Sequence, residues 1–388
     1  MKILITTDLF TTDTNGVVTS VRNLYDEMKR RGHDVRILTI SDNAHSRRDG
    51  DLYYIRSMSL EMIYPNVRMP MSYRHRLIKE LIDWNPDVIH SNCELFSFQF
   101  AMHIAKITGS PIIHTYHTMY EQYVTYVIPS ERIGKFLVRV ISRNRLSKVE
   151  RVVVPTGKVE DTLLRYGIRQ DISVVPSGIS LEQHKKRLTA SEREQKRCEL
   201  GIAQGSMVLL SLGRLGTEKN VDELLRYFAK ASEEREELVF LIVGDGPARN
   251  ALETLCVELG IEGRVIFTGM VDPSKVQEYY QLGDVFVSAS TSETQGLTYI
   301  EAAANGLPLL CRRDTCLKGV IDPGENGFEY TNEEEFHRAL SLILSSKAWR
   351  TLAGKRSEEI AETFGKGAFA EAIEEIYKSV LEKETVGG

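Results

Sequence analysis

The sequence predicts an α/β protein of two domains, each built on a parallel β-sheet. The chain has 388 residues, of which 42% are hydrophobic, and this length suits two ordinary cores at roughly 100 to 200 residues per domain. In both halves, short apolar runs alternate with helical or loop stretches. Strands that alternate with helices are typical of parallel sheets joined by crossover helices.

The first half opens with a strand–helix–strand unit. Residues 2–6 form an apolar run, and residues 19–31 carry apolar side chains at helical spacing with Gly32 just past the end. Glycine in that place is a common helix terminator. Further strands of this half are expected at 35–40, 88–90, 112–114 and 152–155.

The alternation restarts after a proline- and glycine-containing segment at 176–180, with strands expected at 207–212, 238–243, 264–267 and 284–288. Because Pro and Gly interrupt regular structure there, we place the domain boundary at 178. The expected organisation is a first domain at 1–178, a second at 179–365, and a C-terminal helix at 366–388, where apolar residues recur at helical spacing.

The composition is that of an ordinary globular protein, with 27% charged residues and five cysteines that are scattered and lack CxxC pairing. This pattern argues against a disulfide framework or a zinc site. Without a run of about 18 apolar residues or a signal-peptide pattern, a cytoplasmic protein is expected. Residues 1–180 carry 24 Lys/Arg against 19 Asp/Glu, and the remainder 25 against 35. This asymmetry indicates an anionic partner for the first half, although scattered charge more often marks only a solvated surface. No nucleic-acid partner is expected, and the oligomeric state stays open.

The segment 292–308 follows an expected strand and turns into a helix. Gly296, Leu297 and Thr298 open that helix, where unpaired N–H groups and the helix dipole suit a phosphate oxygen. Glu293 precedes the helix and Glu301 lies within it. A glutamate in a helix is often only a solvated side chain, so the neighbouring motifs decide its interpretation.

GRLGTEKN, residues 213–220, directly follows the strand at 207–212. Arg214 and Lys219 are therefore expected at the carboxyl edge of a parallel sheet, where such folds bind ligands. An arginine fork and a lysine point charge together neutralise a leaving diphosphate without a metal, and no metal is expected in this site.

Two glycine-containing turns are weaker signals. VGDGPARN places Gly244 and Asp245 after a strand, and TNGVVTS places Gly16 between the first strand and the first helix. The turn at Gly16 suits close approach to a donor phosphate or sugar. Gly244 and Asp245 are weaker candidates for donor binding, because glycines in turns commonly serve backbone geometry alone. The spacing G-x-G-x-x-G is missing, which disfavours a nicotinamide-dependent dehydrogenase.

In this order and spacing, GRLGTEKN, VGDGP, GMV and the Glu-x7-Glu segment resemble the family-4 retaining glycosyltransferases of GT-B fold. The likeness spans nearly the whole chain. It implies two Rossmann-like domains facing across a cleft, a UDP-sugar donor held by the second domain, and transfer with retention. It also implies that the helix at 366–388 returns to the first domain.

The resemblance also implies roles for single residues. Arg214 and Lys219 match the family's diphosphate-binding pair, and Glu293 matches the glutamate near the donor sugar. Glu301 matches the glutamate on the nucleotide ribose. The base-binding loop corresponds to Met270 and Val271.

The segment HTYHTMYEQYVTYVIP contains His117, which matches a histidine near the donor sugar and acceptor in the family. A strand end is a suitable place for such a group. Its tyrosines, including Tyr123 and Tyr126, resemble those of bacterial diacylglycerol glucosyltransferases. We interpret these two as acceptor or membrane contacts.

Residues 131–151 carry seven basic and two acidic residues. On a helix, five apolar side chains share one face, and the basic side chains lie beside it. This pattern is typical of an interfacial helix on anionic lipid, although a helix packed into the core looks similar. The candidate membrane residues are Arg132, Lys135, Phe136, Arg139 and Arg143.

The expected function is a retaining glycosyltransferase that moves a hexose from a UDP-sugar to a lipid acceptor such as diacylglycerol. Glucose is the expected sugar, although the sequence does not distinguish it from galactose, and UDP is favoured by resemblance only. It would act as a peripheral protein on the inner face of the cell membrane. Two alternatives remain open: transfer to a soluble or other lipid acceptor, and a nucleotide-sugar-binding regulatory protein without catalysis.

Overall fold

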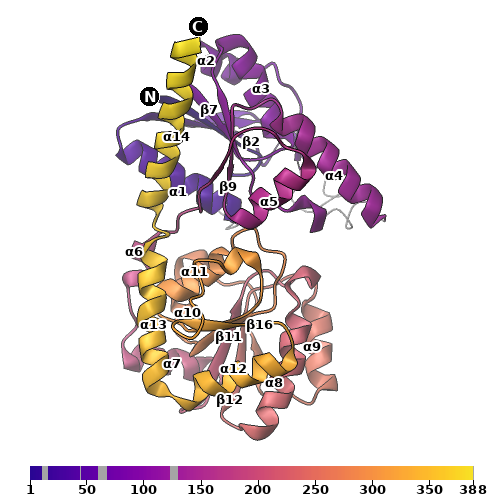
Figure 1. Cartoon of the computed structure of the whole chain (residues 1–388), viewed down its shortest axis with the longest axis vertical. Helices are drawn as coiled ribbons and strands as arrows, with labels where there is room; N and C mark the ends of the chain where they lie inside the picture. The colour runs from indigo at the N-terminus through magenta and orange to yellow at the C-terminus, as the bar shows by residue number, and fades with distance from the viewer. Residues whose placement is uncertain (11–15, 44, 60–67, 123–129, 388) are drawn as a thin grey trace. The chain divides into compact units, whose positions relative to one another are not determined.

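The computed structural model describes residues 1–10, 16–43, 45–59, 68–122 and 130–387. It comprises two compact units: the first is Met1–Gly178 together with Lys366–Gly388, and the second is Ile179–Gly365 (Figure 1). The second unit is one continuous segment, whereas the first is completed by the C-terminal end of the chain. The chain passes between the units after Gly178 and after Gly365.

An eight-stranded sheet forms the centre of the first unit, in the order β10-β9-β8-β7-β1-β2-β4-β3. Strand β3 is antiparallel to β4, and the other pairings are parallel. Strands β3, β4 and β10 were not expected from the sequence. The bounds are β1 Lys2–Thr7, β2 Asp34–Ile40, β3 Arg47–Asp49, β4 Leu52–Ile55, β7 Val88–Ser91, β8 Ile112–Thr115, β9 Arg151–Val154 and β10 Ile172–Val174, with a small antiparallel pair β5 Ser57–Ser59 and β6 Arg68–Pro70.

Helices flank this sheet, and the C-terminal helix α14 is one of them. Phe369, Ile373 and Tyr377 of α14 are buried in one cluster with Val21 and Leu24 of α1, which lies beside α14 in Figure 1. The helices are α1 Gly16–Arg30, α2 Arg76–Trp84, α3 Phe96–Thr108, the short 3-10 turn η1 Tyr120–Gln122, α4 Glu131–Leu146, α5 Gly157–Tyr166 and α14 Lys366–Gly387. The first helix begins at Gly16, three residues before the expected start.

The second unit is a six-stranded, fully parallel sheet in the order β13-β12-β11-β14-β15-β16. Its strands are β11 Met207–Leu212, β12 Leu238–Val243, β13 Val265–Phe267, β14 Val285–Ser288, β15 Leu309–Arg312 and β16 Gly327–Tyr330. Its helices are α6 Leu181–Lys185, α7 Ala190–Glu199, α8 Val221–Glu234, α9 Arg249–Glu258, α10 Val276–Tyr280, α11 Leu297–Ala304, α12 Glu333–Ser345 and α13 Lys347–Glu362, with 3-10 turns η3 Thr217–Lys219, η4 Pro273–Lys275 and η5 Thr315–Leu317.

Both sheets reverse strand order at their first strand. In the first unit β1 lies between β2 and β7, and in the second β11 lies between β12 and β14. Open parallel sheets bind ligands outside the carboxyl ends of the strands at such a reversal. The loops after β1 and β7, and those after β11 and β14, are therefore where functional groups are to be sought.

The two passages of the chain between the units run next to each other. On the first unit's side, a Cβ added to Gly178 would lie 2.5 Å from the Cα of Lys366, so only glycine fits. On the second unit's side, the Ile179 amide donates to the Phe364 carbonyl at 2.9 Å. The Asn23 side-chain amide also donates to the Gly178 carbonyl at 2.7 Å, which fixes this end of the junction to α1.

Candidate active site

The loops after β11, β12 and β13 are joined by backbone hydrogen bonds. The Leu215 amide donates to the Asp245 carbonyl at 2.9 Å, and the Gly244 amide donates to the Gly269 carbonyl at 3.1 Å. Gly244 has a φ of 127°, and a Cβ there would lie 2.0 Å from the Gly213 carbonyl oxygen. The predicted donor-binding residue Gly244 thus has a steric role of its own, because any side chain would separate these loops.

Lys219 and Glu293, which were predicted from separate motifs, form an ion pair in this structure. Lys219 ends η3 after β11, and Glu293 follows β14, so the reversal of strand order brings them together. The Ser290 hydroxyl donates to Oε1 of Glu293 at 3.0 Å and helps to fix that carboxylate. The pair lies at the position where a parallel sheet binds its ligand.

Arg214 lies on the same loop and is paired with a different carboxylate. Its Nη2 donates to Oε1 of Glu218 at 2.5 Å, and the arginine side chain is 43% exposed. The Glu218 side chain is only 9% exposed. Both predicted phosphate-binding cations are thus held by carboxylates and accessible to solvent.

Helix α11 begins at this edge without a side-chain cap. Gly296 is its N-cap with a φ of 75°, and Leu297 and Thr298 follow as its first, partly exposed residues. The N–H groups of a first helical turn lack partners within the helix and suit an anion.

Glu301 lies one turn further along α11. The Tyr280 hydroxyl donates to its Oε2 at 2.8 Å. Removal from water raises the pKa of the Glu301 carboxyl to about 7, and the hydrogen bond from Tyr280 opposes part of that rise. This carboxyl is therefore divided between its two protonation states near neutral pH.

The other donor residues differ in their surroundings. Met270 is 78% exposed, which leaves its side chain available to a planar ring, whereas Val271 packs against the core. Asp245 pairs with Arg249 at 2.9 Å, and the Gly246 amide and Arg249 lower the pKa of its carboxyl. Gly16 is the first residue of α1 in the first unit.

In the first unit, a buried polar cluster lies at the corresponding edge of the sheet. Nε2 of His117 and Oδ1 of Asn92 are 3.0 Å apart, and Nε2 of His114 and Oε1 of Glu94 are 3.2 Å apart. The Tyr120 hydroxyl donates to the other Glu94 oxygen at 2.5 Å. Burial, and then the charge that His114 can carry, lower the pKa of His117 to about 3, so its ring is neutral at physiological pH.

Asn92 and Glu94 were missed by sequence reasoning. They directly follow β7, and the rule that polar residues after a parallel strand form the site would have found them. Of the predicted acceptor residues, Tyr123 and Tyr126 lie outside the described residues.

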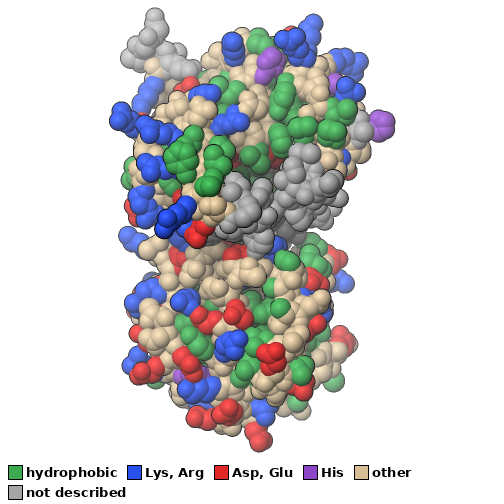
Figure 2. All heavy atoms as spheres, turned by 90° about the vertical axis from the view of Figure 1, so that its right-hand side faces the viewer, with side chains coloured by type: hydrophobic (Ala, Val, Ile, Leu, Met, Phe, Trp, Pro, Cys, Tyr) green, Lys and Arg blue, Asp and Glu red, His purple; other side chains and the backbone are tan. Residues whose placement is uncertain are grey.

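Helix α4 turns most of its large apolar side chains outward. It buries Gly134, Ser142 and Leu146 instead. Its exposed apolar residues are Ile133, Phe136, Leu137, Val140 and Ile141, of which Phe136 is 64% exposed. The predicted Arg132, Lys135, Arg139 and Arg143 lie on the same helix, and all four are exposed. Figure 2 shows hydrophobic side chains lying among Lys and Arg on this side of the first unit.

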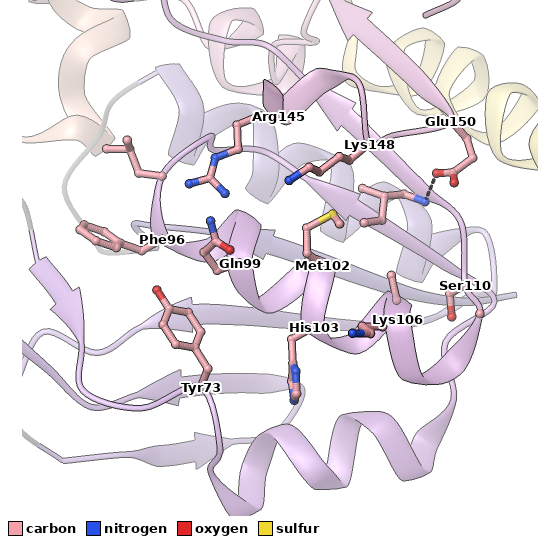
Figure 3. Close-up of a pocket in the computed structure, with 14 residues that line it drawn as sticks. Tyr73, Phe96, Gln99, Met102, His103, Lys106, Ser110, Arg145, Lys148 and Glu150 are labelled. Atoms are coloured by element: carbon pink, nitrogen blue, oxygen red, sulfur yellow. Dashed lines mark hydrogen bonds between the residues drawn. The ribbon is translucent and has the colours of Figure 1, made fainter. Parts of the chain in front are cut away.

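A groove of about 910 Å³ runs along α3 of the first unit. Tyr73, Phe96 and Met102 contribute apolar surface, and Arg145 and Lys148 extend into it from the end of α4 and the turn that follows (Figure 3). The basic character of α4 therefore continues into a hollow beside it.

Within the described part of the chain, no helix is long and apolar enough to cross a membrane. The same residues include no group of three His, Cys, Asp or Glu side chains placed to hold a metal ion.

Comparisons with known proteins agree with this geometry. A family model described as Glycosyltransferase Family 4 matches residues 14–183, and one described as Glycosyl transferases group 1 matches residues 192–363. An alpha-monoglucosyldiacylglycerol synthase of Streptococcus pneumoniae is 33% identical over 99% of this chain and 88% of that protein. A protein of the same name from Acholeplasma laidlawii is 28% identical over 99% of this chain and 98% of its own length.

Solved structures share the fold at low sequence identity. Anabaena HepE in complex with UDP-glucose aligns with a TM-score of 0.75 at 16% identity, covering 98% of this chain and all of that one. The lipopolysaccharide glycosyltransferase WaaG aligns with a TM-score of 0.71 at 18% identity, covering 97% and 99%. The architecture is therefore GT-B, with two Rossmann-like parallel-sheet domains.

Proposed function

The chain belongs to glycosyltransferase family 4, and from that premise we propose that it transfers glucose from UDP-glucose to diacylglycerol, giving an α-glucolipid. The names of the two synthases suggest the product, and the HepE complex suggests the donor. The proposed donor site is the carboxyl edge of the second unit's sheet. The proposed acceptor site belongs to the first unit.

The observation that carries the proposal is the convergence of Lys219, Arg214 and Glu293 at the reversal of strand order. In our proposal the donor diphosphate replaces Glu218 and Glu293 as partner of the two cations. The freed Glu293 then faces the sugar. Fixed positive charge at a departing diphosphate is worth most in the transition state, where the leaving-group charge is largest.

Retention follows from front-face attack in this proposal. The departing phosphate oxygen accepts the proton of the acceptor hydroxyl as the new bond forms on the face from which UDP leaves. No covalent nucleophile and no metal ion are required, because Arg214, Lys219 and the first-turn amides of α11 stabilise the leaving group. Glu301 accepts hydrogen bonds from the ribose hydroxyls, and Met270 lies against the base.

The proposal of a lipid acceptor rests on the surface of α4. Its exposed apolar residues and flanking cations form the surface expected of a helix that lies in the interface of an anionic membrane. A helix packed into the core would bury these apolar side chains, and α4 instead buries Gly134, Ser142 and Leu146. We propose peripheral binding at the inner face of the cell membrane.

The deciding experiment is product formation from UDP-glucose and diacylglycerol in anionic mixed micelles with a chelator present. The expected product is a glucosyl diacylglycerol whose anomeric proton has the coupling of an α linkage. UDP-galactose tests the sugar, and a lipid-free reaction tests the acceptor. Equal release of UDP with and without lipid would exclude the lipid acceptor, and a β linkage would exclude retention.

Charge reversal on α4 should weaken membrane binding. Replacing Arg139 and Arg143 by Glu is expected to cost about 1 kcal/mol or more per residue in binding to anionic vesicles, with UDP affinity unchanged. Vesicle sedimentation measures the first quantity and calorimetry the second. The matched control reverses Arg226 and Lys318, which are exposed in the second unit. Equal loss in both double variants would show a general charge effect and not a membrane face.

A further inference from the structure

We propose that Asn92 is a positioning residue for this transfer: its side-chain oxygen holds His117 in the tautomer protonated on Nε2, so that Nδ1 accepts a hydrogen bond from a substrate hydroxyl. Only the identity of the ligand that carries this hydroxyl rests on the proposed function. The tautomer itself follows from the geometry of the first unit.

The orientation of the Asn92 amide is set by a second contact. Its Nδ2 donates to the His90 carbonyl at 3.3 Å, which leaves Oδ1 facing Nε2 of His117 at 3.0 Å. The residue is 3% exposed, and its backbone amide donates to the Thr6 carbonyl at 2.9 Å. An amide oxygen has no proton to give, so Nε2 of His117 must be the donor.

Nδ1 of His117 is then the unprotonated nitrogen of a neutral ring. It accepts no hydrogen bond from any described residue. The ring is only partly buried, and His117 lies two residues after the end of β8, at the edge where parallel sheets bind ligands. A neutral nitrogen with a lone pair recognises a hydroxyl proton, whereas an imidazolium would offer two donors.

The neighbouring histidines show that this arrangement is particular to His117. His90 has both ring nitrogens engaged, with the Tyr377 hydroxyl at 2.6 Å and the Thr115 hydroxyl at 2.6 Å. His114 directs Nε2 to Glu94, and its Nδ1 is buried without a partner. Among the described histidines of this cluster, His117 is thus the one that combines a fixed tautomer with partial exposure.

The ring nitrogens can be observed directly in the full chain labelled with ¹⁵N-histidine. The expected spectrum shows His117 protonated on Nε2 and unprotonated on Nδ1 from pH 5.5 to pH 8. His184 serves as an internal control, because its Nδ1 already accepts from Asn305 Nδ2 at 2.8 Å. Loss of single signals in His117→Gln and His184→Gln assigns the resonances.

Ligands distinguish the two possible hydroxyls. A change in the Nδ1 signal of His117 with UDP-glucose but not UDP identifies a hydroxyl of the donor sugar. A change that requires diacylglycerol micelles in the presence of UDP identifies the acceptor hydroxyl. No change with either ligand would overturn the substrate contact.

Two variants separate positioning from packing. Asn92→Leu removes the acceptor oxygen and should lower kcat about tenfold at every pH. Asn92→Asp keeps an oxygen at Nε2 but favours an imidazolium, with His114 and His90 as the other ionisable groups that act on His117. Its kcat relative to the unchanged chain should recover at pH 8 and fall towards pH 5.5. Asn250→Asp, an exposed asparagine of the second unit, is the charge control.

Equal losses in Asn92→Leu and Asn92→Asp at every pH would reduce Asn92 to a packing residue and overturn the proposal. So would a His117 proton found on Nδ1. If the spectra show the expected tautomer while no glucolipid forms, the proposed function fails and the tautomer assignment stands.

Discussion

The two units share one architecture, yet their sheet edges differ in chemistry. After β11 and β14 of the second unit, ionised side chains face one another, as in the Lys219–Glu293 and Arg214–Glu218 pairs. After β7 and β8 of the first unit the corresponding groups include a neutral histidine, His117, against an amide, Asn92. The fold supplies two equivalent positions, and the residues that follow the strands decide what each position binds.

The difference matches the two partners of a sugar transfer. A diphosphate is anionic and needs fixed positive charge, whereas an acceptor hydroxyl is neutral and needs a hydrogen-bond partner. The contribution of the charged or neutral side chains can therefore be tested separately at each sheet edge.

The largest effect is expected from removing a cation of the second edge. Lys219→Ala should lower kcat by about 10²- to 10³-fold, the usual cost of one electrostatic contact to a transition state. Steady-state kinetics with saturating UDP-glucose measures the loss. Lys230→Ala removes an exposed lysine paired with Glu333 at 3.0 Å and should leave kcat unchanged. A loss below threefold for Lys219→Ala would contradict the role of its charge.

An intermediate effect is expected from acid. Burial lowers the pKa of His90 to about 3, whereas an unfolded histidine titrates near 6.5. The unfolded state thus binds the proton first, and the stability contributed by His90 is complete above pH 6.5 and is lost as pH falls. Between pH 6.5 and 5 the loss is about 2 kcal/mol, and His117 adds to it in the same unit.

The second unit should resist acid better. Its His184, with a pKa lowered to about 4, also loses stability on acidification, but Glu301, with a pKa raised to about 7, gains as pH falls from 7 towards its unfolded value. Hydrogen exchange at pH 7 and pH 5 should show the first unit opening first. His90→Gln should reduce that pH dependence by about 2 kcal/mol, and an unchanged slope would refute the assignment.

The smallest effect concerns donor binding. A carboxylate that accepts hydrogen bonds from ribose hydroxyls must be ionised, so donor binding favours ionised Glu301. The affinity for UDP-glucose should therefore rise by up to about tenfold from pH 6 to pH 8, as this carboxyl loses its proton. Calorimetry with UDP-glucose avoids the terminal phosphate titration of UDP. Glu301→Gln should flatten the profile, and a profile that stays as steep would assign the proton to another group.

Much of the fold could be predicted from the sequence, because buried parallel strands are continuous apolar runs bounded by turns. Strands β3 to β6, β10, β15 and β16 were not expected. Of these, β3 carries only exposed polar side chains, and β10 is short and partly exposed. Lys219 and Glu293 were predicted from motifs near strand ends, and the structure pairs them. Asn92 was missed because its role depends on His117, 25 residues away.

Helix α4 shows where the pattern alone was insufficient. Its apolar stripe predicted either a core-packed or an interfacial helix, and both interpretations share one periodicity. The structure buries Gly134 and Ser142, two residues that no hydrophobicity pattern would place inside. Small residues allow a helix to approach its neighbours closely, and α4 packs against α5 and η1 with a face that contains Gly134 and Ser142 beside Leu146.

The junction has a consequence for the order in which the chain is made. The ribosome releases residues 1–178 first, but the core of the first unit still lacks Phe369, Ile373 and Tyr377 of α14. The His90 ring also lacks its hydrogen bond with the Tyr377 hydroxyl until α14 has been made. The second unit, continuous from Ile179 to Gly365, has all of its residues earlier. The half that emerges first is therefore completed after the second unit, and until residues 366–387 have emerged it exposes the apolar strip on α1 that α14 covers.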